Sequence, residues 1–244
     1  MIFGFGAKGK PYDSKPRFFP RQEYLCLTLG HGNRICLYDK NLDKKGRKEA
    51  MKKRDNEIYQ FKITLQGSKP PIWRRFIVPG NYRFWDLHLA IQDAMGWEDC
   101  HLHLFTMSSP RQKREAQIGI PEDDEYLKST KEFIKDYFSL QNPSATYVYD
   151  FGDGWRHKLT LEKISTEKED ETYPQCTGGK HACPPENCGG LEMYYQYISV
   201  FNDPQHEGHE EVKAWLGEDF DPEAFEPDEV EFQDPVARQK EVGL

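Results

Sequence analysis

The sequence predicts an α+β fold: an antiparallel sheet with a few packed helices, plus a small N-terminal appendage. Short segments that alternate apolar and polar residues indicate strands, and turn-forming residues separate them. Other segments place their apolar residues on one helical face. Together these elements are typical of α+β proteins.

Length and composition favour a soluble protein. A chain of 244 residues is long enough for one large domain or for one domain with an appendage. The mean hydropathy is −0.85, and no run approaches the roughly 18 apolar residues of a membrane span. The start shows no secretory signal, and the six cysteines are dispersed, so we expect a cytoplasmic protein without a membrane partner.

The charge of the chain is unevenly distributed. Residues 1–57 hold 14 Lys and Arg against 7 Asp and Glu, whereas residues 202–244 hold 3 against 14. Either these ends fold against each other, or the basic end binds an acidic protein or nucleic acid while the acidic end remains solvated. Self-docking is the simpler interpretation.

The N-terminal elements form the predicted appendage. Residues 1–22 have no hydrophobic period and predict a poorly ordered arm. Residues 24–30 and 33–39 form a predicted hairpin, and 41–55 are charged almost throughout. The expected organisation is a basic arm with a hairpin over 1–56, an α+β domain over 57–231 and a tail over 232–244.

The main domain begins with alternating strands and a helix. Residues 58–66 and 71–80 predict an antiparallel pair, and 83–95 predict a helix that Gly96 ends. A strand is expected from His101, and the polar residues 108–131 predict a long loop. Residues 131–140 predict at most a short helix.

The stretch YVYDFGDGWRHKLTLEKI, residues 147–164, predicts a hairpin with an aromatic face. A three-residue loop, 152–154, places Phe151 opposite Trp155, Tyr149 opposite His157 and Asp150 opposite Arg156. A two-residue loop would oppose Asp150 to His157 as an acid/base pair. The hydrophobic pattern favours the first register, because a slip of one residue would mix the faces.

The C-terminal region predicts two helices and an irregular acidic segment. The helices cover 191–201 and 210–217, and residues 219–235 are too rich in Pro and acidic residues to be regular. We expect this last segment to lie over the surface, held by Phe220, Phe225 and Phe232.

The cysteine-rich segment YPQCTGGKHACPPENCGG predicts a loop with a candidate zinc site. Its ligands would be Cys176, His181, Cys183 and Cys188, because thiolates and imidazoles are the groups that zinc prefers. The spacing lacks the paired C-x2-C of zinc fingers, so the alternative is a Pro/Gly-rich loop with buried thiols.

A second candidate site is built from histidines. Residues two apart in a strand face the same side, so His101 and His103 are expected to share a ligand. With His157 and Asp150 on a neighbouring strand they make a conceivable metal site; the alternative is hydrogen bonding at the sheet rim. The predicted binding residues are His101, His103, Asp150, Asp153, Trp155, His157 and Arg74, and no catalytic residue is assigned.

Four ordered motifs resemble one known family, the plasmid pRi ORF-three-like domain, named after the third open reading frame of a root-inducing plasmid. They are IYQFKITLQGSKPPIWRRFIVPGNYRFWDLHLAIQDAMGWEDCHLHLF, YVYDFGDGWRHKLTLEKI, YPQCTGGKHACPPENCGG and FEPDEV, in order between residues 57 and 231. The resemblance implies a compact α+β domain found in bacteria, archaea and mobile elements, with no established activity.

The family pattern marks a set of positions here. These are Pro71, Ile72, Trp73, Arg74, Leu87, His88, Met95, Gly96, Trp97, His101, Leu102, His103, Phe105, Tyr149, Asp150, Phe151, Gly152, Asp153, Trp155, His157, Cys176, Cys183, Pro184, Pro185, Glu186, Gly189 and Gly190. Residues 1–56 are a departure from the family, so this basic appendage is expected to provide partner specificity.

The sequence is compatible with three alternative functions. The first is a binding or interaction domain, stabilised by zinc and linked to mobile-element biology. The second is a metal-dependent hydrolase that uses the histidine site on a phosphate-containing substrate, with Arg74 or Arg156 as a charge clamp. The third is nucleic-acid binding through the basic N-terminal arm.

Overall fold

The computed structural model describes residues 25–28, 34–37, 56–110, 114–120 and 126–244. The chain divides into two compact units, Met1–Lys48 and Glu49–Leu244. In the first unit, β1 (Leu25–Thr28) and β2 (Arg34–Leu37) pair antiparallel, which confirms the predicted hairpin. The remainder of the predicted basic arm and the linker 41–55 lie outside the described residues.

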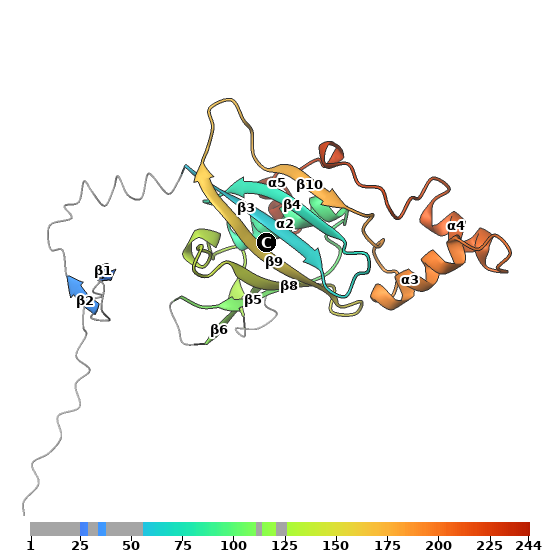
Figure 1. Cartoon of the computed structure of the whole chain (residues 1–244), viewed down its shortest axis with the longest axis horizontal. Coiled ribbons are helices and arrows are strands. Elements are labelled where there is room, and N and C mark those ends of the chain that lie inside the picture. The colour runs from blue at the N-terminus through green and yellow to red at the C-terminus, as the bar shows by residue number, and fades with distance from the viewer. Residues whose placement is uncertain (1–24, 29–33, 38–55, 111–113, 121–125) are drawn as a thin grey trace, which may run out of the picture. The chain divides into compact units, whose positions relative to one another are not determined.

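The second unit is built on an eight-stranded sheet, which confirms the α+β prediction (Figure 1). Its strands follow the order β10-β4-β3-β9-β8-β5-β6-β7, and every neighbouring pair is antiparallel except β6 and β7. The bounds are β3 Glu57–Leu65, β4 Trp73–Pro79, β5 His103–Ser108, β6 Glu115–Gly119, β7 Leu127–Lys128, β8 Ser144–Tyr149, β9 Trp155–Thr166 and β10 Gln175–Lys180.

One face of the sheet carries the core because the strands alternate buried and more exposed residues. In β3 the side chains of Tyr59, Phe61, Ile63 and Leu65 are buried. The other face is polar, and there Arg75 pairs with Glu162 at 2.6 Å. This division is the expected pattern for an antiparallel sheet with one covered face.

Helix α2 (Phe84–Met95) covers the core face. Only its two aspartates escape burial, so almost every side chain of the helix is enclosed. The Asp86 carboxylate accepts a hydrogen bond from the Arg83 N–H at the start of the helix. Gly96 ends it in the left-handed conformation, with φ of 82°. The predicted helix and its end are therefore confirmed.

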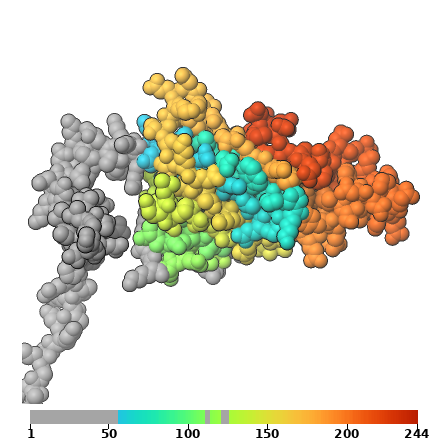
Figure 2. Space-filling view, viewed as in Figure 1, coloured from blue at the N-terminus to red at the C-terminus, as the bar shows by residue number. Residues whose placement is uncertain are grey.

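The C-terminal elements add three helices to the unit. Helices α3 (Gly190–Phe201) and α4 (His209–Leu216) project beyond one end of the sheet (Figures 1 and 2). Helix α5 (Pro235–Glu241) packs on α2. Two short 3-10 helices, η1 (Ile134–Asp136) and η2 (Pro227–Glu229), complete the elements of the described chain.

Two segments predicted as loops form strands, so those predictions are wrong. Residues 108–131 contain β6 and β7, and the cysteine-rich segment contains β10, the edge strand beside β4. Each of these strands is short, so its alternating pattern is a weak signal. In addition, β10 gains its hydrogen bonds from β4, which is distant in the sequence.

The hairpin at 147–164 has a longer loop than predicted. Tyr149 pairs with Trp155 and Tyr147 with His157, which leaves residues 150–154 as the loop. The predicted pairing of Phe151 with Trp155 is wrong, and Phe151 is 53% exposed. The face is nevertheless preserved, because the register differs by two residues and not by one.

Asp150 explains the longer loop. It has φ of 52°, its carboxylate accepts a hydrogen bond from the Gly152 N–H at 2.8 Å, and its own N–H donates to the Leu102 carbonyl. These bonds turn the chain before Asp150 reaches Arg156. Val148 faces Arg156 instead, so the predicted Asp150–Arg156 pair does not form.

Candidate functional site

Three motifs distant in sequence meet at one end of the sheet. The Trp97 indole N–H donates to the Pro184 carbonyl at 2.9 Å, and the Trp97 ring stacks on Tyr149. The Tyr149 hydroxyl donates to Glu186 at 2.7 Å and accepts from the Cys100 N–H. The loops around residues 97–101 and 184–187 are therefore held together through the last residue of β8. We call this place the motif rim.

His101 lies at the motif rim but outside the strand. Its Nε2 is 2.9 Å from Asn187 Oδ1 and 3.6 Å from Asp150 Oδ2. His103 is instead the first residue of β5 and is buried. The two histidines therefore have different surroundings, because the strand begins only at His103, and a ligand shared by His101 and His103 remains a prediction.

The backbone at the motif rim is strained. Asp99, Asp150 and Asn187 have φ values of 56°, 52° and 59°, and His181 is the fourth such residue in the described part of the chain. Non-glycine residues in this region persist where the surrounding contacts hold them. Here the side chains provide those contacts, since each of the three aspartate or asparagine residues makes a hydrogen bond.

Behind the motif rim lies a closed chain of buried polar groups. Gln92 donates to the Tyr147 hydroxyl at 2.9 Å, and that hydroxyl lies 2.8 Å from His88 Nδ1. His88 Nε2 is 2.7 Å from Asp99 Oδ1. The consistent assignment has Tyr147 donating to Nδ1 and the Nε2–H donating to the Asp99 carboxylate.

His88 is neutral in this chain. Burial lowers its pKa to about 3, with a further contribution from the nearby Arg238. Burial likewise raises the pKa of Asp99, although Arg238 opposes that shift. The short His88–Asp99 contact is therefore a hydrogen bond between a neutral ring and a carboxylate. Arg238 of α5 donates to the same carboxylate at 3.3 Å, which anchors the tail on the domain.

His103 and His157 are buried without hydrogen-bond partners for either ring nitrogen among the described residues. The His103 ring stacks on His88 with centroids 3.7 Å apart, and the His157 ring packs edge-on against Trp97. Burial lowers the pKa of His157 to about 3 and that of His103 in the same direction. Both are neutral core residues, and Asp150 makes no hydrogen bond to His157, as predicted.

The remaining hairpin residues have structural roles. Trp155 is buried and packs near Trp97. The Asp153 carboxylate accepts a hydrogen bond from the Gly189 N–H at 3.0 Å, so the hairpin loop holds the start of α3. Gly190 is required at that point, because a Cβ there would lie 2.8 Å from the Asp153 carbonyl oxygen.

The predicted zinc ligands have separate surroundings. Cys176 contacts the Arg75 carbonyl on the sheet edge, and the Cys188 thiol contacts the Gly190 carbonyl. Burial raises the pKa of Cys183 to about 12 and that of Cys188 to about 11. Both therefore stay protonated at neutral pH.

His181 has its own partners. Its Nδ1 lies 3.0 Å from the Pro71 carbonyl and its Nε2 lies 3.1 Å from a Glu223 oxygen. In the described part of the chain, no group of three or more His, Cys, Asp or Glu residues is placed to hold a metal ion. These residues, as arranged here, do not fit a four-ligand zinc site, and zinc binding remains a prediction.

Arg74 is the predicted binding residue with the most unusual surroundings. It stands on the core face of β4 and is only 2% exposed. Its Nε donates to the Ala94 carbonyl, and its Nη1 donates to the Trp73 and Lys180 carbonyls at 2.9 and 3.1 Å. Burial lowers its pKa from the usual 12.5, opposed by nearby Cys183. An arginine in this position still stays charged at neutral pH.

Phe225 covers one side of the Arg74 guanidinium, with 3.7 Å from the guanidinium carbon to the ring centre. The approach requires Gly179, which pairs with Arg74 across β10 and β4. A Cβ on Gly179 would overlap the Phe225 ring and lie 2.9 Å from Arg74 Cδ. The prediction that Phe225 holds the acidic segment on the surface is thus confirmed.

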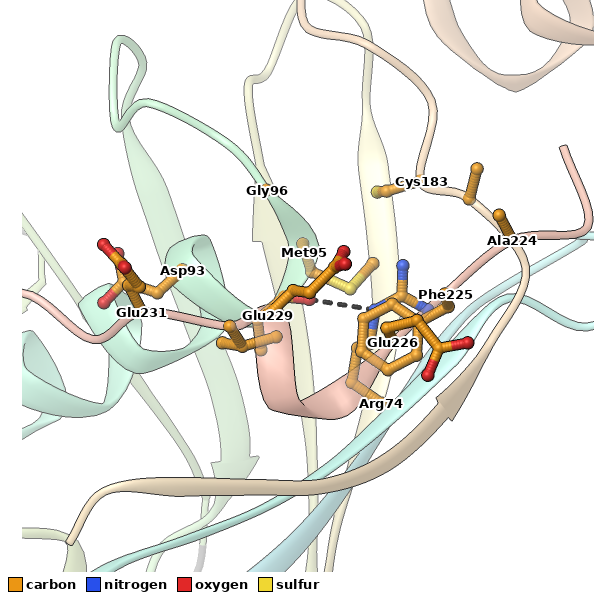
Figure 3. Close-up of a pocket in the computed structure, with 13 residues that line it drawn as sticks. Arg74, Asp93, Met95, Gly96, Cys183, Ala224, Phe225, Glu226, Glu229 and Glu231 are labelled. Atoms are coloured by element: carbon orange, nitrogen blue, oxygen red, sulfur yellow. Dashed lines mark hydrogen bonds between the residues drawn. The ribbon is translucent and has the colours of Figure 1, made fainter. Parts of the chain in front are cut away.

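Arg74 lines a pocket of about 350 Å³ between the end of α2, the chain after β10 and the acidic segment (Figure 3). We call it the Arg74 pocket. Figure 3 shows the guanidinium next to the Phe225 ring, with Cys183 on the other side. The lining residues are Arg74, Asp93, Ala94, Met95, Gly96, Ala182, Cys183, Ala224, Phe225, Glu226, Glu229, Val230 and Glu231.

Comparison with known proteins assigns the chain to a family. The pattern of the plasmid pRiA4b ORF-3-like proteins matches residues 57–229. The chain belongs to this family. A relative from Sinorhizobium fredii, "Uncharacterized protein y4hQ", is 33% identical over 169 residues, which cover 66% of this chain and 81% of that protein.

A solved structure supports the same assignment. It is the crystal structure of "Protein of Unknown Function MM3350" from Methanosarcina mazei Go1, with 47% identity and a TM-score of 0.69. The match covers 72% of this chain and 98% of that one. The second unit of this chain therefore has the fold of the Methanosarcina mazei protein. No helix among the described residues has the length and apolar character that crossing a bilayer requires.

Several residues of the site were not singled out from their chemistry. His88, Trp97 and Glu186 are marked by the family resemblance alone, while Asp99, Asn187 and Phe225 are not predicted as site residues. A usable signal is present for Asp99 and Asn187, because both are residue types that tolerate positive φ and each lies within one of the four motifs.

Proposed function

We propose that this plasmid pRiA4b ORF-3-like protein is a binding domain that takes a carboxylate-bearing ligand in the Arg74 pocket. One observation carries the proposal: a buried guanidinium that has no carboxylate partner among the described residues lines a pocket. Charges this buried are normally paired. An external anion would complete the pair.

The hydrogen-bond inventory leaves room for one anion. A guanidinium has five N–H groups, and in Arg74 the hydrogen bonds to the Ala94, Trp73 and Lys180 carbonyls use three of them. Nη2 therefore retains its two N–H groups, within the described part of the chain, for a ligand. Two parallel N–H groups suit a carboxylate or a phosphate oxygen pair.

A carboxylate is favoured over a phosphate because of the other charges in the pocket. Asp93, Glu226, Glu229 and Glu231 all line it, and a doubly charged phosphate would be repelled more strongly than a single carboxylate. Three residues that the family resemblance marks, Met95, Gly96 and Cys183, form part of the same wall.

The test compares two neighbouring arginines. Short carboxylic acids, amino acids and inorganic phosphate are added to the wild type, to Arg74→Lys and to Arg75→Lys, and the melting temperature is measured. A carboxylate should raise the melting temperature of the wild type and Arg75→Lys, since a ligand stabilises the state that it binds. Arg74→Lys should lose the rise, because lysine lacks the planar fork. A rise with phosphate alone, or one that Arg74→Lys retains, would contradict the proposal.

The hydrolase alternative gains no support from the described residues. His103 and His157 are enclosed by aromatic rings, and His101 faces Asn187 at the motif rim. These three imidazoles do not converge on a common point with Asp150.

Zinc binding and nucleic-acid binding remain proposals of their own. Stoichiometric zinc that Cys183→Ser removes would support the cysteine site, and less than a tenth of an equivalent would exclude it. For the basic arm, deletion of residues 218–244 should raise retention on heparin at low salt if the acidic end covers it. Salt should abolish that gain, because charges are screened over about 8 Å at physiological ionic strength.

A further inference from the structure

The acidic residues of the Arg74 pocket fall into two kinds. Asp93 is satisfied, since both of its carboxylate oxygens accept hydrogen bonds from Gln233. Glu226, Glu229 and Glu231 are exposed, and their carboxylates have neither a hydrogen bond nor an ion pair within the described residues. Figure 3 shows Glu226 beside Phe225 and Glu231 beside Asp93. The pocket thus combines a buried cation with unpaired carboxylates on its open side.

The chain segment that contributes the three glutamates is itself strongly acidic. Residues 190–231 contain 13 Asp and Glu and a single Lys. A ligand that carries only negative charge would meet this field before it reached Arg74, and its association would be slowed. A ligand with a positive group as well would be attracted by the glutamates and would still have a carboxylate for Arg74.

Part of the pocket wall is apolar. Met95, Ala182, Ala224 and Val230 are among the lining residues. Such a wall suits an aliphatic stem of the kind that joins the charged head of lysine or arginine to its backbone. The volume of about 350 Å³ is at the small end of ligand pockets, which span about 300–1,000 Å³.

We infer that the Arg74 pocket binds a basic amino-acid unit with a free α-carboxylate. The carboxylate pairs with Arg74 Nη2, the stem lies along the apolar wall, and the cationic head faces Glu226, Glu229 and Glu231. The inference rests on the proposed function, because it requires Arg74 to hold a carboxylate, and it adds the class of ligand. Two sources share this chemistry: free arginine or lysine, and the C-terminal residue of a peptide.

The experiment separates the charges of the ligand. Three ligands are compared by isothermal titration calorimetry of the full chain: L-arginine, agmatine and glutarate. Agmatine is arginine without its carboxylate, and glutarate has two carboxylates and no cation. L-arginine should bind at least tenfold more tightly than either of the others. The variant E226Q/E229Q/E231Q changes only exposed side chains, so it should fold normally. It should lose about tenfold in affinity for L-arginine, which corresponds to about 1.4 kcal/mol shared among three exposed charge contacts.

The source of the ligand is decided by a second pair of probes. The peptide Ala-Ala-Arg is titrated as the free acid and as its C-terminal amide. Tighter binding of the free acid than of L-arginine indicates a chain terminus, and the reverse order indicates the free amino acid. In either case the amide should bind at least tenfold more weakly than the acid.

The outcomes distinguish this inference from the proposed function. If glutarate binds as well as L-arginine and the triple variant binds both unchanged, a carboxylate site exists but the basic class is wrong. If none of the carboxylates binds the wild type or the triple variant, both the inference and the proposed function are overturned. If agmatine binds as tightly as L-arginine while glutarate still binds, only the inference is overturned; if glutarate does not bind, the proposed function is overturned as well.

Discussion

The buried histidines and the buried arginine are two regions of one core that treat charge in opposite ways. His88 of α2, His103 of β5 and His157 of β9 are buried, and burial lowers the pKa of each, so they are neutral. Arg74 of β4 is buried at the C-terminal end of α2, where its Nε donates to the Ala94 carbonyl. Burial lowers its pKa too, but the guanidinium stays charged at any physiological pH.

The difference shows which of the two regions keeps a buried charge that an anion could pair with. A histidine in an apolar site is satisfied by releasing its proton, so two rings without hydrogen-bond partners are tolerated. An arginine has no such release, and its charge must be balanced by hydrogen bonds or by an anion. The motif rim is closed by its own hydrogen bonds, whereas the Arg74 pocket retains a donor. For this reason our proposal places the ligand at Arg74 and not at the histidines.

The largest effect expected concerns Arg74 itself. Arg74→Met should lower the free energy of unfolding by about 3 kcal/mol, because the Ala94, Trp73 and Lys180 carbonyls lose their donor and unsatisfied buried groups cost about 1–3 kcal/mol each. Arg75→Met is the control, since its ion pair with Glu162 is exposed and worth at most about 1 kcal/mol. Urea unfolding measures the free energy of unfolding of both variants. An equal decrease in the two variants would contradict the special role of Arg74.

A smaller effect is expected from acid. The unfolded chain protonates His157 near pH 6.5, whereas the folded chain keeps it neutral until about pH 3. The contribution of His157 to the free energy of unfolding is therefore fully present above pH 6.5, and it is lost as the pH falls from 6.5 toward 3. Between pH 7 and pH 5 the loss is about 2 kcal/mol, at about 1.4 kcal/mol per pH unit.

The His157 contribution is isolated by substitution. His157→Leu should remove this part of the pH dependence, while the exposed His206→Gln should leave the wild-type slope. The comparison is made by urea unfolding at pH 5 and pH 7. A His157→Leu slope identical to that of the wild type would mean that His157 is protonated in the fold.

The third comparison tests the contact between Phe225 and Arg74. Gly179→Ala places a methyl group against both side chains, and overpacking of this kind costs about 1–3 kcal/mol. Gly178→Ala is the matched control on the same strand, because its Cβ would meet Trp73 at an ordinary 3.7 Å. If the two alanine variants melt at the same temperature, Phe225 does not pack on Arg74 in solution.

Local sequence was sufficient for the elements that carry their own pattern. The helix at 84–95, the strand at 57–65 and the hairpin around residue 152 were predicted because period, end signals and turn residues agree within one segment. The predicted register of the hairpin is wrong because of the turn at Asp150. Its bond to the Leu102 carbonyl comes from another strand, which no local pattern contains.

The candidate site was predicted in its residue types but not in its grouping. Arg74 was selected as a charged group in a motif, and the histidines were selected as possible ligands. Burial separates these residues into a neutral histidine cluster and a charged pocket. The sequence does not reveal this burial, because Arg74 and Arg75 are neighbours of the same residue type. One of these arginines is 2% exposed and the other forms a surface ion pair.

By itself the sequence determined the α+β class, the family and the alternation that gives the sheet one apolar face. Only the tertiary structure decided that β10 supplies Gly179 opposite Arg74 and that Phe225 covers the guanidinium. It also decided that His88 meets Tyr147 and Asp99. The physical reason is the same for each. Periodicity is set by neighbours along the chain, whereas burial and hydrogen-bond partners are set by segments that meet only after the chain has folded.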